Sequence, residues 1–388
     1  MQQSNLSFLQ QSTLWLLIAA SFSINLPVGF GSVTLGLFLI LWAVSGAYKT
    51  KFALVANNPG ALVALAFLGL YALGTTYSSA SWHDALHYLL KYAKFIVIPL
   101  AVGALLSDRY RQYALNAFLI SLILYLVVSY LNWFGLVPLR YIHHGTYLAF
   151  GFYMMLRNAR KTAGHHRTTW IILAALTLFD LIFITDVRTG VVTSFVLFLI
   201  FAVETWGLKG LMYLGGLLLI TLVLFKLVPG AAHSRLYGMH AEVQSNATSA
   251  GIRAEMYTNT LKLIKTHPVF GGGTGSLQGE YTKLIADDPH VIARRITNCH
   301  NQYLMTAHEL GVVGLLLLLA FWGVHWWQSY QLTQVEHGHL LRALIVNTSV
   351  GSLLNSLLLD SGDGRMYCIL AGVLLSGYLH KPGSLKAD

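Results

Sequence analysis

The stretch NCHNQYLMTAHELG, residues 298–311, places His300, His308 and Glu309 directly before the apolar run VVGLLLLLAFWGVHWW. A histidine titrates near neutral pH, so His300 could take a proton from a hydroxyl group; its alternative role is to cap or pack a helix. Glu309 is not its acid–base partner, because nine residues at about 100° each put the two on opposite sides of a straight helix. We expect Glu309 to be a structural ion that bonds to the backbone or to an arginine, and His308 matches no ligand set.

Four arginines could hold a phosphorylated substrate: Arg140, Arg188, Arg253 and Arg365. The planar guanidinium group stays charged and binds phosphate oxygens through two parallel hydrogen bonds, so a cluster of arginines suits a diphosphate group. The alternative for each arginine is a solvated side chain, or one that snorkels to lipid phosphate or pairs with a nearby carboxylate.

Two lysines and two histidines could add to the same polar region. Lys91 and Lys94 lie within one apolar segment, and their alternative role is to snorkel to the membrane interface. His143 and His144 stand at the start of another segment, and their alternative role is to pack with bonds to the backbone.

Several stretches look like metal or nucleotide sites and lack the residues such sites need. GGGTGSLQGE, residues 271–280, has no Gly-Lys-Ser/Thr ending, so we interpret it as a flexible turn that folds the loop back over the membrane face. HELGV is not HExxH, because Val312 occupies the place of the second histidine. No DxD pair occurs, and Cys299 and Cys368 show no metal spacing. We therefore expect neither a metal nor a cofactor.

The composition predicts an all-α polytopic membrane protein. Hydrophobic residues make up 55% of the 388 residues and charged residues only 10%, with a mean hydropathy of +0.60. A soluble domain carries about 25% charged residues. The net charge of +10 does not form one patch or arm, so it does not predict nucleic-acid binding. The N-terminal stretch lacks the basic start of a secretory signal, and we expect it to be retained.

About 20 apolar residues are needed to cross a bilayer as a helix. Scanning for such runs predicts about twelve membrane-spanning helices, near 13–27, 29–46, 60–77, 85–106, 112–134, 142–157, 169–185, 190–205, 208–229, 311–328, 340–359 and 364–380. Three parts result: helices one to nine in 1–229, a large polar loop with the catalytic edge in 230–310, and the last three helices with a tail in 311–388.

Basic residues in short loops indicate which side faces the cytoplasm. The loops after even-numbered segments and the tail hold most of them: Lys49, Lys51, Arg109, Arg111, Arg157, Arg160, Lys161, Arg167, Lys209, Arg342, Lys381 and Lys386. Both termini are therefore predicted to be cytoplasmic and the large loop external, which in a bacterium is the periplasm. Arg140, Arg188 and Arg365 lie on the outer side against this rule, which favours a functional role for them.

The large loop contains one amphipathic segment, IRAEMYTNTLKLIKTHP. Ile252, Met256, Thr260 and Leu263 share one face of a helix that Pro268 ends. Arg253 lies near its start, on the outer side with the other arginines.

The chain resembles the bacterial O-antigen ligase and polymerase superfamily, and it looks most like the ligases. The resemblance rests on HNQYL followed by HELGVVGLLLL, on the Arg-Thr-Gly of TDVRTG, on RAEMY in the loop helix and on the Gly-rich turn before the histidine. By motif it is specific over roughly 180–315, and by architecture it extends over nearly the whole chain.

The resemblance implies a GT-C-like, inverting, metal-independent glycosyltransferase of the inner membrane, with its active site facing the periplasm. Such enzymes move a glycan from undecaprenyl diphosphate to an acceptor, which for a ligase is lipid A–core oligosaccharide. By motif, Arg188 and Arg253 would bind the diphosphate and His300 would be the essential histidine. We add Arg140 and Arg365 on charge placement only. The expected partners are the donor, the acceptor and membrane lipids.

Two relatives with the same chemistry and one unrelated class compete with this interpretation. O-antigen polymerases more often carry two sizeable outer loops, and pilin-glycosylating oligosaccharyltransferases carry a C-terminal extension, neither of which is evident here. A secondary transporter would fit twelve spans, with Asp180 as a coupling carboxylate. Transporters tend to show repeated halves, and no repeat is found.

Overall fold

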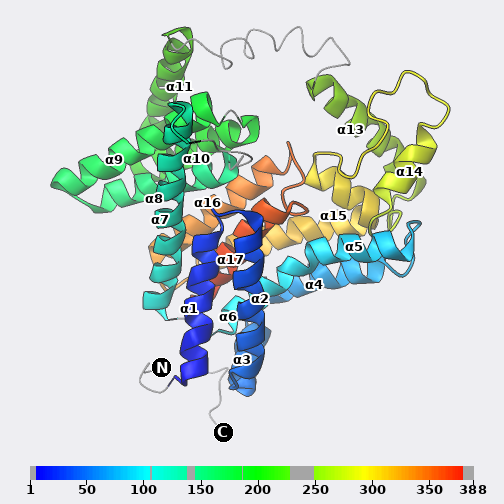
Figure 1. The fold of residues 1–388 in the computed structure, drawn as a ribbon, viewed down its shortest axis with the longest axis horizontal. Coiled ribbons are helices and arrows are strands. Elements are labelled where there is room, and N and C mark those ends of the chain that lie inside the picture. Colours follow the sequence, from blue (N-terminus) through cyan, green and yellow to red (C-terminus); the bar gives the residue numbers. More distant parts are fainter. Residues whose placement is uncertain (1–5, 105–106, 138–144, 186, 228–248, 379–388) are drawn as a thin grey trace.

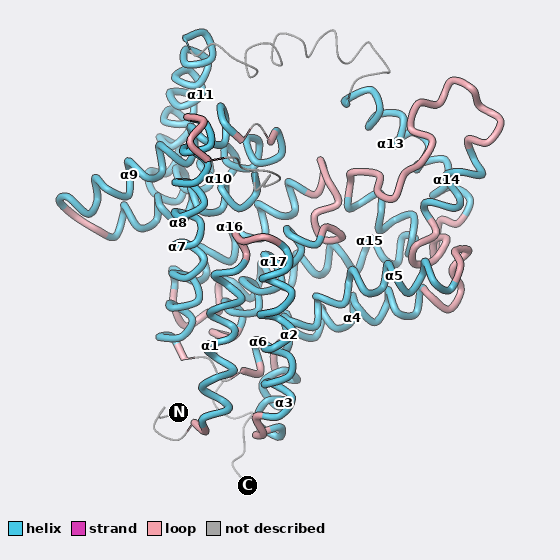
Figure 2. Tube along the Cα trace, in the orientation of Figure 1, coloured by secondary structure: helices cyan, strands magenta, loops and turns pink. Residues whose placement is uncertain are grey.

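The computed structural model describes residues 6–104, 107–137, 145–185, 187–227 and 249–378, and these form a helical bundle (Figure 1). Within the described residues no strand occurs, and the only pairing of the β type is an isolated bridge between Leu332 and Tyr378 (Figure 2). The predicted all-α class is confirmed.

The helices before the large loop follow in this order: α1 (Phe8–Ser23), α2 (Val28–Val44), α3 (Tyr48–Ala56), α4 (Pro59–Gly74), α5 (Trp82–Tyr92), α6 (Val97–Val102), α7 (Asp108–Trp133), α8 (Gly145–Lys161), α9 (Gly164–Phe179), α10 (Arg188–Trp206) and α11 (Gly210–Leu227). Local signals set several starts: Ser7 forms a capping box before α1, and Asn58 caps α4, which has Pro59 in its first turn. A 3₁₀ turn, Ala93–Ile96, joins α5 to α6.

The remaining helices carry the candidate site: α13 (Ser249–Thr266), α14 (Leu277–Leu284), α15 (Gln302–Ser329), α16 (Val335–Gly351) and α17 (Ser361–Leu375). α15 packs along α4 and α16, and α13 and α14 pack against it (Figure 1). α17 lies inside the bundle, and all of its residues 366–375 are buried. A helix that is apolar on every side belongs in such a core.

Five helical stretches among the described residues are long and apolar enough to cross a membrane, and a sixth results if the pair α2 and α3, bent by 114°, counts as one. Each of the twelve predicted segments overlaps a helix. Several of these helices are shorter than a bilayer requires, so the number twelve stays a prediction.

One predicted helix is wrong at its end. The segment 340–359 was expected to be one span, but α16 ends at Gly351 and residues 352–360 form turns. Hydropathy alone does not separate a buried apolar loop from a buried helix, and the leucines at 357–359 are buried in this loop. The polar Ser352, Asn355 and Ser356 in this leucine-rich run were the available signal.

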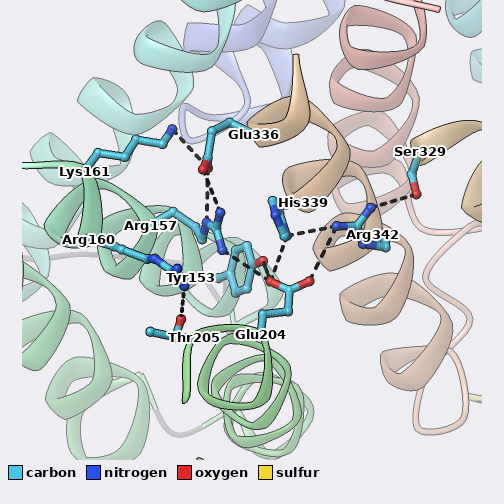
Figure 3. Close-up of polar contacts among 10 residues, drawn as sticks. All are labelled: Tyr153, Arg157, Arg160, Lys161, Glu204, Thr205, Ser329, Glu336, His339 and Arg342. Atoms are coloured by element: carbon cyan, nitrogen blue, oxygen red, sulfur yellow. Dashed lines mark hydrogen bonds and ion pairs between the residues drawn. The ribbon is translucent and has the colours of Figure 1, made fainter. Parts of the chain in front are cut away.

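A network of charged side chains ties α8, α10 and the start of α16 together (Figure 3). Arg157 lies between two carboxylates, with Nη1 3.3 Å from Glu204 Oε2 and Nη2 2.7 Å from Glu336 Oε1. Glu204 also faces His339 Nδ1 at 2.9 Å and Arg342 Nη2 at 3.6 Å. Only 4% of the Arg157 side chain is exposed, so its charge is compensated inside the bundle.

Candidate functional site

Helix α15 is broken at Gly311, which has φ 64° and ψ −161°. A side chain at this position would collide with the carbonyl group of Val269, so the close approach requires glycine. The segment 268–275 lies in the break, and Gly272 donates its N–H to the carbonyl oxygen of His308 at 2.9 Å. The backbone groups that the break leaves without helical partners are therefore satisfied by the glycine-rich segment.

The glycine-rich segment is a packed turn, which corrects the expectation of a flexible one. Residues 272–277 are buried. Thr274 donates its N–H to the carbonyl oxygen of Gly74 at 3.1 Å, and Ser79 donates its own to Gly272 at 2.9 Å. The turn thus joins α15 to the end of α4, and its backbone groups are used for structure.

Glu309 and His308 belong to this packing. Glu309 is fully buried, and its Oε1 accepts the N–H of Gly275 at 2.7 Å, as expected for a structural carboxylate bonded to backbone. His308 is buried too, with Nε2 3.1 Å from Ser276 Oγ and 3.6 Å from Glu280 Oε2. Both residues therefore hold the turn against α15, while His300 precedes the helix.

His300 stands in a backbone conformation that is uncommon for a residue with a side chain. Its φ is 55°, in the left-handed region. Three neighbours hold it there: Asn298 Oδ1 accepts the His300 N–H at 2.8 Å, Tyr257 donates its hydroxyl to the His300 carbonyl oxygen at 2.8 Å, and the Asn301 side chain caps α15. The imidazole is half-buried at the start of the helix.

The segment 352–360, which joins α16 to α17, forms the other wall of the His300 region. Asn301 Nδ2 donates to the carbonyl oxygen of Leu353 at 3.1 Å. His300 Nδ1 lies 3.0 Å from Asn355 Oδ1. Sequence reasoning missed Asn355 because it had assigned this segment to a membrane helix.

The loop helix α13 meets the same segment. On the predicted face of this helix, Met256, Thr260 and Leu263 are buried and Ile252 is half-buried. Arg253 donates from Nη1 to the carbonyl oxygen of Leu354 at 3.4 Å, a long hydrogen bond. Tyr257, one turn further, also donates to Leu353 at 3.3 Å. Arg253 and His300 therefore lie around one short stretch of backbone.

Arg188 belongs to another helix, α10. It is the first residue of α10 and its side chain is exposed. Next to it, Thr189 packs against the end of α16, since a side chain on Gly351 would lie 3.2 Å from Thr189 Cγ2. The start of α10 thus reaches the end of α16, and the segment that follows α16 is the one that Arg253 and His300 contact.

Arg365 points to a different place. Its Nη1 donates to Val28 O at 3.0 Å and to Ser32 Oγ at 3.2 Å, both in α2, and its Nε donates to Ser361 O at 2.7 Å. These bonds fasten α17 to α2. Diphosphate binding by Arg365 stays a prediction that this geometry does not favour.

The other predicted polar residues are only partly described. Three of them lie outside the described residues: Arg140, His143 and His144. Lys94 donates to the carbonyl oxygen of Leu359 at 3.1 Å, so it anchors the far end of the segment 352–360. Lys91 lies over the ring of Tyr88, with Nζ 4.4 Å from the centroid.

Cys299, directly before His300, is fully buried, and its Sγ donates to the carbonyl oxygen of Asn301 at 3.3 Å. Burial raises the pKa of its thiol to about 12. Within the described part of the chain, no group of three or more His, Cys, Asp or Glu residues could hold a metal ion. A reaction without metal or cofactor stays a prediction.

The long apolar helices and the polar site at their ends define the class: this is an all-helical, multi-pass membrane protein. Residues 173–319 match the family model described as O-antigen ligase, a segment that contains Arg188, Arg253 and His300. The match supports membership of the O-antigen ligase family and an activity of the O-antigen ligase and polymerase type, on membrane lipid-linked glycan substrates. A search of curated proteins finds no match.

Proposed function

We propose that this protein is an O-antigen ligase of the bacterial inner membrane, which transfers O-antigen glycan from undecaprenyl diphosphate to lipid A–core oligosaccharide. The observation that carries the proposal is the meeting of His300, Arg253 and the Arg188 end of α10 around residues 351–355, all three lying within the matched family segment. One basic nitrogen and two guanidinium groups are what transfer from a diphosphate needs.

The reaction is a single displacement at the anomeric carbon of the first sugar. The acceptor hydroxyl oxygen forms a bond to that carbon while the bond to the diphosphate oxygen breaks, which inverts the configuration. The hydroxyl proton passes to His300, and Arg188 and Arg253 stabilise the charge on the departing undecaprenyl diphosphate. The energy is stored in the donor, so the scheme needs neither ATP nor a metal ion.

The proposal includes a topology. Twelve helices cross the inner membrane in a GT-C-like arrangement, both termini are cytoplasmic, and the site faces the periplasm. The distribution of Lys and Arg supports this orientation. The single large loop, 230–300, favours a ligase over a polymerase.

Purified components test the proposal directly. The protein is mixed with undecaprenyl-diphosphate glycan and lipid A–core, with EDTA and without ATP, and products are separated by gel electrophoresis. Glycan attached to lipid A–core supports the ligase. Chain growth on the donor without lipid A–core would indicate a polymerase instead.

Movement of substrate across a vesicle membrane without transfer would indicate a transporter. One feature belongs to that alternative: Asp180 is fully buried in a π-helical turn, Asp180–Ile184, where Thr185 donates its hydroxyl to the carboxylate. A buried carboxylate at such a turn is often functional, so the vesicle assay is a necessary arm of the test.

A further inference from the structure

We infer that Asn355 is a positioning residue for His300, which holds the imidazole as the tautomer protonated on Nδ1 and leaves Nε2 to accept the proton of the acceptor hydroxyl. The inference rests on the proposed function and assigns a role that neither the sequence motifs nor the family match contains. It is carried by the hydrogen bonds of one side-chain oxygen.

The contact between His300 and Asn355 has a defined direction. The Asn355 oxygen accepts the backbone N–H of Ser356 at 3.0 Å, and an amide N–H can only donate. The atom at this position is therefore Oδ1 and not the amide nitrogen. His300 Nδ1, 3.0 Å from the same oxygen, must then carry the hydrogen. In a neutral imidazole the second nitrogen, Nε2, is the one with a free electron pair.

Asn355 is itself held by the fold. Gln302, in the first turn of α15, donates its N–H to Ser352 O at 2.9 Å and accepts the N–H of Leu359 on its Oε1 at 3.0 Å. The turn that carries Asn355 is therefore clamped at both ends by one residue of the helix that His300 precedes. This keeps the amide oxygen at a fixed place relative to the imidazole.

The ionisable groups near the imidazole come from four elements. Hydrogen bonds place three ionisable residues of the helices α5 and α13 there, Tyr88, Arg253 and Tyr257, and two further sites are Cys299 before α15 and the turn itself. Of these, Tyr257 donates its hydroxyl to the backbone carbonyl oxygen of His300, and Tyr88 donates its hydroxyl to that of Thr297 at 2.6 Å. Among the described residues, the hydrogen bond made by the ring itself is the one to Asn355, which is uncharged.

Two substitutions of Asn355 separate positioning from packing. Asn355→Leu keeps the volume and removes the acceptor, so transfer should fall on the order of 10–100-fold at the pH optimum. Asn355→Asp keeps an acceptor for Nδ1–H and adds a negative charge that favours the protonated imidazole. The acidic limb of the pH–rate profile should therefore move up by about one pH unit, while the rate on the alkaline side stays within about tenfold of the unmodified protein.

Asn116→Leu, on the exposed face of α7, is the matched control and should leave both rate and pH profile unchanged. Wild-type transfer in Asn355→Leu, together with an unshifted acidic limb in Asn355→Asp, would overturn the inference. If Asn355→Leu fails to fold, the position of the acidic limb in the pH–rate profile of Asn355→Asp still tests the inference. His300→Ala, measured beside them, separates the levels: its inactivity together with an unshifted Asn355→Asp profile rejects only the positioning role, and its full activity rejects His300 as the base. Failure of the unmodified protein to transfer glycan to lipid A–core rejects the proposed function.

Discussion

The two ends of α16 hold positive charge in different ways. At the start of the helix, Arg157 lies between the carboxylates of Glu204 and Glu336 (Figure 3). Beyond its end, Arg253 donates to the carbonyl oxygen of Leu354 and forms no ion pair within the described residues. The first arrangement compensates the charge of its guanidinium group, while the second leaves charge available to a ligand.

This difference teaches how to separate structural from functional arginines. A buried cation between two anions is held in place for folding, and removing it leaves carboxylates without a partner. A guanidinium group that meets only neutral oxygens at the mouth of a bundle keeps its attraction for phosphate. Substitutions at the two ends should therefore act on different quantities, stability at one end and transfer at the other.

The largest effect is expected from His300→Ala. Loss of a general base lowers the rate by about 10²–10⁴-fold, so glycan transfer to lipid A–core should be almost lost while donor binding and the melting temperature stay near those of the unmodified protein. Rates come from the purified-component assay, and binding from a filter assay with labelled donor. His83→Ala, at an exposed histidine whose side chain is 92% accessible, is the control. Wild-type transfer by folded His300→Ala would remove the base assignment.

Arg157→Met should act on stability instead. It removes the partner that Glu204 and Glu336 share. Glu204 keeps His339 and Arg342 and Glu336 keeps Lys161, so the cost should be below the about 3 kcal/mol of a buried carboxylate left alone. We expect a clear fall in melting temperature in detergent, with the transfer rate per folded molecule unchanged. The triple variant Arg157→Met, Glu204→Gln, Glu336→Gln should recover part of the loss. Normal stability combined with lost transfer in Arg157→Met would reverse the assignment of the two ends.

Arg253 should behave in the opposite way. Arg253→Ala removes charged hydrogen bonds to diphosphate of about 1.5–3 kcal/mol, so donor binding should weaken by roughly 10–100-fold with little change in melting temperature. Arg253→Lys keeps the charge without the two-pronged geometry, so it should recover only part of the binding. Titration with undecaprenyl diphosphate alone measures both variants. Equal binding by Arg253→Ala and the unmodified protein contradicts a phosphate role.

The sequence allowed much of this contrast to be predicted. Apolar runs, and amphipathic spacing for α13, located every described helix of 15 residues or more, and the motifs of the family resemblance singled out Arg188, Arg253 and His300, because these signals are local. The turn at 352–360 was missed, since leucines buried in a loop have the same hydropathy as leucines in a span. Asn355 was missed with it, because its contact with His300 joins residues 55 positions apart.

The glycine-rich segment, residues 271–280, also depends on contacts between distant residues that a local pattern does not predict. Its composition predicted a flexible turn, because isolated glycines favour loose backbone. Its actual order comes from partners that no local pattern reveals: the carbonyl oxygens of His308, Glu309 and Gly74 accept its N–H groups. The positive φ at Gly311 leaves backbone groups of α15 without helical partners, and hydrophobic periodicity does not predict it.

The smallest effect concerns Cys299, and it tests whether the backbone under His300 stays closed. Burial raises the pKa of this thiol to about 12, so the reactive thiolate is nearly absent at pH 7–9 in the folded protein. In a Cys368→Ala background, iodoacetamide should label Cys299 far more slowly, at every pH from 7 to 9, than it labels an exposed thiol of pKa about 8.5. His83→Cys, made in a background without either native cysteine, gives that exposed reference, and labelling in SDS gives the unfolded one. Fast labelling of Cys299 in the folded protein would mean that the backbone next to His300 opens. The region around His300 would then not be held in place as firmly as the ion pairs of Arg157 with Glu204 and Glu336.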